Sequence, residues 1–254
     1  MSAASGHNTR IISLRNNPAV RHRRFGDLAA LAQKGDGVLL LNIELTDAEI
    51  EALAASPLAV VSVGMHNVPW DNVGIDNVAA ARAATEHLLD LGHWVLAILS
   101  GREKGNRSVL TATERRHGLE PALAGRDLVV DPDLAVDAGS SIERGQQAMN
   151  ELIENRRLPS AIFAGCDETA FGAMTALREH GLSAPRNVSI IGLDEHPMSR
   201  FMSLSTVQQP VADHGAFAAN LLEERPQNPD ADLEPAHHVL PTTLLTRKST
   251  RRKR

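Results

Sequence analysis

The segment from Pro159 to Asp194, PSAIFAGCDETAFGAMTALREHGLSAPRNVSIIGLD, contains one complete unit of the predicted fold. Its apolar run at 161–164 has the length of a buried strand, and the helical run at 168–180 ends at Gly181. A second buried strand is predicted at 188–193. This order is typical of a parallel βαβ unit.

The same alternation extends in both directions. The expected strands are 9–14, 38–41, 58–63, 94–99, 128–130, 161–164 and 188–193, with extended stretches at 205–209 and 239–245. Helices are expected at 20–33, 78–91, 110–123, 142–155, 168–180 and 212–223. Another helix is expected to begin after its cap Thr46 and to run to about Ala55. A loop is expected at 225–235. Pro121 is expected to end or kink its helix early. Two successive βαβ series predict an α/β fold with two doubly wound parallel-sheet lobes.

Composition excludes several classes of protein. The chain has 254 residues, of which 43% are hydrophobic, enough for one large core or two modest ones. No apolar run approaches the ~20 residues of a membrane helix, and the polar start lacks the apolar core of an export signal. The single cysteine, Cys166, fits a reducing compartment, so we expect a cytoplasmic protein with no membrane partner.

Charge is unevenly distributed along the chain. The net charge is −5, but six of the 26 Lys and Arg residues lie in the last eight positions, which leaves 20 basic against 31 acidic residues elsewhere. A body this acidic does not suit a nucleic-acid surface. The basic tail, 248–254, is expected to be solvated, with contact to DNA as the less favoured alternative.

Polar residues follow three of the expected strands, where doubly wound sheets bind ligands. Asp167 follows the strand at 161–164, Asp194 follows 188–193, and Asp76 and Asn77 precede a helix. Helix N-capping explains Asp167, and Asp76 or Asn77, equally well. Asp194 is harder to explain in this way, because the following Glu-His-Pro does not resemble the start of a helix.

Arg115 is a fourth candidate, because its planar fork of donors suits a carboxylate or paired hydroxyls. The alternative is that it belongs to a solvated helix face. Familiar enzyme motifs are missing from the sequence, Cys166 has no second cysteine, and His237 and His238 have no partner at metal-site spacing. We therefore expect no catalytic residue, no metal and no cofactor. An acid/base cluster at Asp194, Glu195 and His196 is kept only as a weak enzymatic alternative.

Six ordered blocks of the sequence resemble the LacI/GalR (lactose-repressor) family of transcriptional regulators, including the lactose and purine repressors. The blocks are 75–93, 159–172, 181–185, 187–194, 204–210 and 240–250. The resemblance covers roughly residues 8–250, and blocks in a fixed order are more specific than any single motif.

The resemblance implies a periplasmic-binding-protein-like core of type I, with two lobes joined by three crossovers near Gly92, at 205–208 and after Arg225. It implies an N-terminal lobe of 1–91 and 208–228, and a C-terminal lobe of 92–207 and 233–247. It also implies effector contacts at Asn77, Arg115, Asp167 and Asp194, converging from both lobes on one crevice. The implied effector is a sugar, a nucleobase or a related metabolite, and a homodimer is expected.

The chain departs from the family pattern in three respects. The helix-turn-helix headpiece that would bind operator DNA is absent from it, the first strand and helix of the core do not appear, and Cys166 replaces an asparagine of many relatives. The expected function is the effector-binding domain of a LacI-type transcriptional repressor. The alternative is a solute-binding receptor of a transport system, which would need an export signal or a lipid-anchor cysteine.

Overall fold

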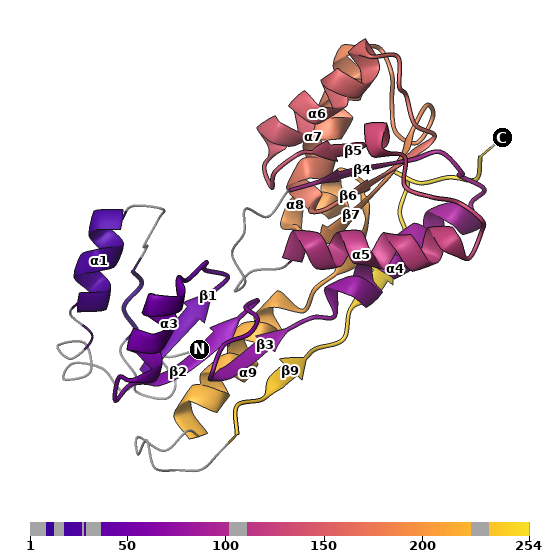
Figure 1. Cartoon of the computed structure of the whole chain (residues 1–254). Coiled ribbons are helices and arrows are strands. Elements are labelled where there is room, and N and C mark those ends of the chain that lie inside the picture. Colours follow the sequence, from indigo (N-terminus) through magenta and orange to yellow (C-terminus); the bar gives the residue numbers. More distant parts are fainter. Residues whose placement is uncertain are drawn as a thin grey trace. The chain divides into compact units, whose positions relative to one another are not determined.

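A computed structural model describes residues 9–12, 18–26, 28, 37–101, 111–224 and 234–253. Contacts divide these residues into two compact units. Unit 1 contains the described residues up to Gly74 and those of 211–240, and unit 2 contains those of 75–210 and 241–253. The chain thus passes between units after Gly74, Pro210 and Leu240 (Figure 1).

Unit 2 is built on a six-stranded sheet of order β10-β8-β7-β6-β4-β5, parallel except for the antiparallel pair β10–β8. Its strands are β4 (Leu96–Ser100), β5 (Ala135–Asp137), β6 (Ala161–Ala164), β7 (Ser189–Asp194), β8 (Ser205–Gln208) and β10 (Thr243–Leu245). Its helices are α4 (Asn77–Asp90), α5 (Thr111–Ala124), the 3-10 helix η1 (Pro132–Leu134), α6 (Ile142–Glu154), α7 (Asp167–Glu179) and α8 (Pro197–Phe201).

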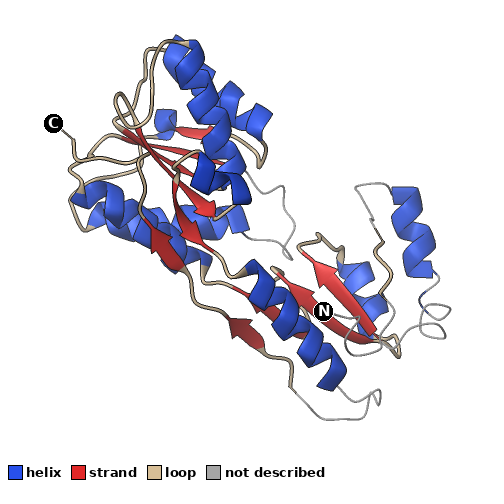
Figure 2. Cartoon of the chain, turned by 180° about the vertical axis from the view of Figure 1, so that it is seen from behind, coloured by secondary structure: helices blue, strands red, loops and turns tan. Residues whose placement is uncertain are grey.

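Alternating strand residues face two different cores in unit 2. Ile162 and Ala164 of β6 pack with α6 and α7, whereas Ala161 and Phe163 pack with α4 and α5. Successive side chains of a strand point to opposite faces, so a strand buried on both faces is apolar throughout. Helices therefore cover both faces of the sheet (Figure 2), and the predicted doubly wound α/β architecture is confirmed.

Unit 1 holds a four-stranded parallel sheet of order β1-β2-β3-β9. Its elements are α1 (Pro18–Gly26), β1 (Gly37–Leu41), α3 (Asp47–Ala54), β2 (Ala59–Val63), β3 (Asp71–Gly74), α9 (Val211–Glu224) and β9 (His237–Val239). Leu40 and Val60 share a core with Leu53 of α3, while Val61 and Val73 pack against Ala218 of α9. Thr46 caps α3 as predicted, in a capping box with Glu49.

Two predicted strands are wrong, and one of two alternatives for a proline is excluded. Residues 128–130 form no strand: the Leu128 N–H donates to Leu123 O as α5 ends, Val129 is 87% exposed, and the strand forms later as β5. Residues 9–12 are not a strand either, and Ile11 is 93% exposed; 13–14 lie outside the described residues. Pro121 does not end its helix early, because α5 continues to Ala124, while the alternative of a kink stays a prediction.

Other predictions fall partly outside the described residues. The helix expected at 20–33 appears as α1, but apart from Leu28 the positions from 27 to 33 are not described. Residues 225–233 of the expected loop are likewise not described, and 234–236 carry no regular structure. No helix among the residues described is long and apolar enough to cross a membrane.

The contacts place α4 in unit 2, whereas the sequence analysis assigned residues up to Leu91 to the N-terminal lobe. The reason is close helix packing between α4 and α5. A Cβ added at Gly118 of α5 would lie 2.3 Å from Val78 O and 2.9 Å from Ala81 Cβ of α4. Glycine at this position lets the two helices approach at backbone distance, which ties α4 to the unit of α5.

The basic segment 247–253 is not a solvated extension. The Ile190 N–H donates to Ser249 O, the Ser249 hydroxyl donates to Ile190 O, and the Lys253 N–H donates to Leu91 O. Ser249 is 2% exposed. Backbone hydrogen bonds to two elements of unit 2 therefore fix this segment, so it is not a free tail, although the side chains of Lys248, Arg252 and Lys253 are exposed to solvent.

Candidate functional site

Asn77 lies at the first position of α4, directly after the N-cap. Asp76 is the cap, and its carboxylate accepts from the Ala79 N–H at 2.8 Å, so the capping interpretation holds for Asp76. The Asn77 side chain is instead buried, and its Nδ2 donates to Glu114 Oε2 at 2.9 Å. Asn77 thus places a polar side chain inside unit 2, hydrogen-bonded to α5.

Arg115 is buried at 7% exposure, so the solvated-face interpretation is wrong for this residue. Its Nε donates to Asn77 Oδ1 at 3.0 Å, and its Nη1 donates to Gly165 O beyond the end of β6. Its Nη2 lies 3.5 Å from Asp194 Oδ1. Within the described part of the chain, these contacts do not use every N–H of the guanidinium, so N–H groups remain to donate to a ligand.

Asp194 is the last residue of β7 and lies opposite Arg115. Gln209 Nε2 donates to Asp194 Oδ1, and the backbone of Asp194 has a φ of 138°. Burial raises the pKa of Asp194 from 3.8 to about 6; Arg115 opposes the rise, and the negative charge of Asp167 adds to it. At neutral pH the site therefore holds a carboxylate that is poorly solvated and depends on its cationic neighbour.

Asp167 occupies a different position from the other three candidates. It does not cap α7, because the N-cap is Cys166, so the capping interpretation is wrong here. The Asp167 side chain is fully buried; Oδ1 accepts from Thr206 Oγ1 at 2.7 Å, and Oδ2 accepts from the His196 N–H at 2.9 Å and from Ser199 Oγ. Burial raises its pKa, while these donors lower it. The protein itself therefore supplies hydrogen bonds to both oxygens.

The close approach of the Asp167 carboxylate to β7 depends on Gly192 of that strand. A Cβ added at Gly192 would lie 2.1 Å from Asp167 Oδ1. Only glycine leaves room for the carboxylate against the strand at this position. Sequence reasoning placed Asp167 at a strand end correctly, but could not show that its side chain turns inward.

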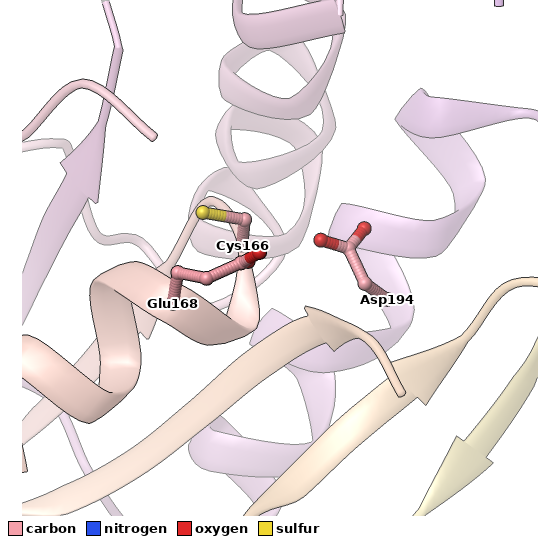
Figure 3. A group of neighbouring side chains, drawn as sticks. All are labelled: Cys166, Glu168 and Asp194. Atoms are coloured by element: carbon pink, nitrogen blue, oxygen red, sulfur yellow. The ribbon is translucent and has the colours of Figure 1, made fainter. Parts of the chain in front are cut away.

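Cys166 and Glu168 complete the group around Asp194 (Figure 3). The thiol of Cys166 and the carboxylates of Glu168 and Asp194 have ligand atoms within 4.8 Å of one another. Cys166 is buried, its Sγ lies 3.2 Å from Thr169 Oγ1, and burial raises the pKa of its thiol, as expected for a packed and unreactive cysteine. Thiol and carboxylate groups bind metals, but Arg115 already supplies positive charge beside Asp194, so the geometry does not require an ion.

The structure thus brings Asn77, Arg115 and Asp194 into one connected group in unit 2, with Asp167 behind it. Sequence reasoning did not identify Gln209, Glu114 or Glu168 as members of this group. Gln209 lies within a block that carried the family resemblance, which was the available signal. Glu114 precedes Arg115 and Glu168 follows Asp167 in the sequence. Neither was predicted, because a charged residue on a helix is usually exposed to solvent and does not by itself indicate a binding site.

The enzymatic alternative finds no support in the arrangement of its residues. Glu195 is paired with Arg247, and the His196 Nδ1 accepts from the Met198 N–H as the N-cap of α8. The prediction that no helix starts after Asp194 is wrong, because α8 begins at Pro197, a residue that suits the first turn of a helix. These two side chains are engaged in ion pairing and capping.

Comparisons with known proteins identify the family of the chain. The family model of the periplasmic binding protein-like domain matches residues 85–250. The HTH-type transcriptional repressor PurR of Histophilus somni (strain 129Pt) is 32% identical over 225 residues, which cover 87% of this chain and 66% of the repressor. This chain therefore spans just under two thirds of the length of that relative.

Two solved structures extend the comparison. A complex of the transcriptional regulator CelR with cellobiose has a TM-score of 0.81 at 29% identity, covering 92% of this chain and 71% of that one. A LacI family transcriptional regulator from Enterococcus faecium with bound ribose has a TM-score of 0.76 at 28% identity, covering 91% and 85%. These relatives are regulators rather than enzymes, which agrees with the expectation for this chain. The chain belongs to the LacI/GalR family, of which it represents the periplasmic-binding-protein-like effector-binding core.

Proposed function

We propose that this chain senses a small polar metabolite through Asn77, Arg115 and Asp194, and that it does so as part of a transcriptional repressor. The observation that carries the proposal is the guanidinium of Arg115, which is buried at the carboxyl ends of β6 and β7. Ligands of doubly wound sheets bind at such strand ends. A buried cation beside a partly buried carboxylate offers donors and acceptors to hydroxyl, amide or ring-nitrogen groups.

The effector class we propose is a sugar, with a nucleobase as the second choice. CelR was solved with cellobiose and the Enterococcus faecium regulator with ribose, and both share the fold of this chain. Asp194 and Arg115 suit the vicinal hydroxyls of a sugar, because a carboxylate accepts from one hydroxyl while a guanidinium donates to the next. Asp167 supports the site from behind in this proposal, since the protein already satisfies both of its oxygens.

The partners of the whole protein follow from the same proposal. The relative PurR is named an HTH-type transcriptional repressor, and the whole protein is proposed to bind DNA through a helix-turn-helix segment of that kind. Two such segments on a homodimer would bind a palindromic operator in the cytoplasm. Sedimentation of the purified chain tests the dimer.

A ligand screen tests the sensing role directly. Calorimetry with ribose, cellobiose, glucose and hypoxanthine would be performed on the wild type, on Asp194→Asn and on Arg157→Gln. Arg157 pairs with Asp133 at 2.7 Å at the surface, so its variant is the matched control. We expect at least one compound to bind the wild type and the control, and to bind Asp194→Asn at least tenfold more weakly. Failure of every compound to bind a folded wild type would contradict the proposed effector classes.

A further inference from the structure

The turn that carries Asp194 has an unfavourable backbone conformation. Asp194 has a φ of 138° and Glu195 a φ of 63°, and neither residue is glycine. Consecutive non-glycine residues at positive φ cost free energy and persist only where surrounding contacts hold them. This conformation directs the Asp194 carboxylate toward Arg115, so the contacts that hold the turn also determine the geometry of the site.

The first of these contacts comes from Asp167, the first residue of α7. Asp167 Oδ2 accepts from the N–H of His196, the residue that ends the turn, at 2.9 Å. Thr206 Oγ1 donates to Asp167 Oδ1 at 2.7 Å and accepts from the Glu195 N–H at 3.4 Å. One fully buried carboxylate is therefore linked, directly and through Thr206, to two successive amides of the turn.

The second contact comes from the basic segment 247–253. Arg247 Nη1 and Nη2 donate to the two oxygens of Glu195 at 2.8 and 2.6 Å. Nη1 also donates to Leu204 O at 2.7 Å, and the Arg247 N–H donates to Ser205 Oγ at 2.8 Å. The two side chains are only 19% and 20% exposed. A paired guanidinium of this kind restricts Glu195 in direction as well as distance.

We propose that Arg247 and Asp167 are positioning residues that hold the Asp194–Glu195 turn in the form that binds effector, which rests on the effector role proposed above for Asp194. Neither residue needs to touch the effector. The basic segment is in this way a structural support of the effector site, and its first arginine acts through Glu195.

A titration of Asp194 by carbon-13 NMR tests the positioning role without any ligand. The signal is assigned by its loss in Asp194→Asn, and the groups near Asp194 are Arg115, Asp167, Gln209, Glu168 and Cys166. Arg247→Gln is expected to release the turn, expose the carboxylate and lower its pKa by about one unit. Loss of the positive charge alone would raise that pKa, so the direction of the change separates the two effects.

Further variants keep the test decisive. Arg247→Lys should give a smaller change than Arg247→Gln, and Arg157→Gln should give none. Glu195→Gln should also lower the Asp194 pKa, but the loss of its negative charge acts in the same direction as release of the turn, so Arg247→Gln is the deciding variant. An unchanged or raised pKa in folded Arg247→Gln would overturn the positioning role. Calorimetry with ribose and cellobiose on the same variants should show at least a tenfold loss for Arg247→Gln. If neither sugar binds the wild type, the proposed effector class fails, and the NMR result still decides the positioning role.

Discussion

Arg115 Nη2 lies 3.5 Å from Asp194 Oδ1, with side-chain exposures of 8% and 26%. The pair joins α5 to the end of β7, and Asn77 of α4 holds the guanidinium from its other side. A charge pair this poorly hydrated is costly to break from one side only, because the remaining charge loses its partner. The interdependence of these two residues leads to the first prediction.

Arg115→Met is expected to lower the free energy of unfolding by about 2 to 3 kcal/mol, because it leaves Asp194 charged without its cation. The double variant Arg115→Met, Asp194→Asn is expected to recover part of that loss, since no charge then remains unpaired. Urea denaturation at pH 7 measures both. Strictly additive effects of the two substitutions on the free energy of unfolding would show that the pair is not coupled.

Asp194→Asn is expected to change how stability depends on pH. The pKa of Asp194 is about 6 in the folded chain against 3.8 for the free group, so protonation favours the folded state. The contribution is fully present below pH 3.8 and is lost as the pH rises through 6, for a total of about 3 kcal/mol. Burial lowers the pKa values of His93 and His214, so these histidines reduce the stability of the folded chain as the pH falls, which is the opposite of the effect of Asp194.

The measurement is therefore the difference in unfolding free energy between Asp194→Asn and wild type at each pH. This difference should shift in favour of the variant between pH 4 and pH 6.5 and then remain constant. A difference that does not vary over this range would mean that the pKa of Asp194 is not raised.

Gly118→Ala is expected to destabilise the chain by about 1 to 3 kcal/mol, because the new methyl group would lie 2.3 Å from Val78 O. Gly215→Ala is the matched control, since Gly215 also lies within a helix and has nothing within 4 Å of the added Cβ. The control should raise stability by up to about 1 kcal/mol, from helix propensity. Equal effects of the two substitutions in thermal unfolding would contradict the close packing of α4 on α5.

Thr46→Ala is expected to lower stability by about 1 kcal/mol, because Thr46 Oγ1 accepts from the Glu49 N–H in the capping box of α3. Glu51→Ala, at an exposed position of the same helix, should change stability by less than about 0.5 kcal/mol. Hydrogen exchange localises the effect to α3. Protection of that helix unchanged by Thr46→Ala would argue against the cap.

Patterning predicted the parts of the fold that depend on local sequence. The strands β6 and β7 and the helix α7 follow from apolar runs and a glycine stop, and they appear within a few residues of the expected bounds. β5 was missed because it has only three residues and forms through pairing with β4, which local sequence does not encode. The ordering of 247–253 was missed for a similar reason, since its partners Ile190 and Leu91 are far away in the sequence.

The candidate site could be predicted only in part. The ends of the predicted strands identified the positions of Asp167 and Asp194, but not the direction of their side chains. Gly192 leaves room for the Asp167 carboxylate against β7. The positive φ values of Asp194 and Glu195 accompany the orientation of Asp194 toward Arg115. Arg115 followed from the family resemblance rather than from composition. Gln209 depends on a contact across fifteen residues, which no local pattern revealed.

The last strands of the two sheets have a consequence for biosynthesis. β9 and β10 each occupy an edge, and both come from residues after 236. A polypeptide leaves the ribosome from its N-terminus, so β3 and β8 must remain without their outer neighbours until translation has passed this point. During that interval each nascent sheet exposes unpaired backbone groups, which makes the growing chain a natural client for chaperones that shield strand edges.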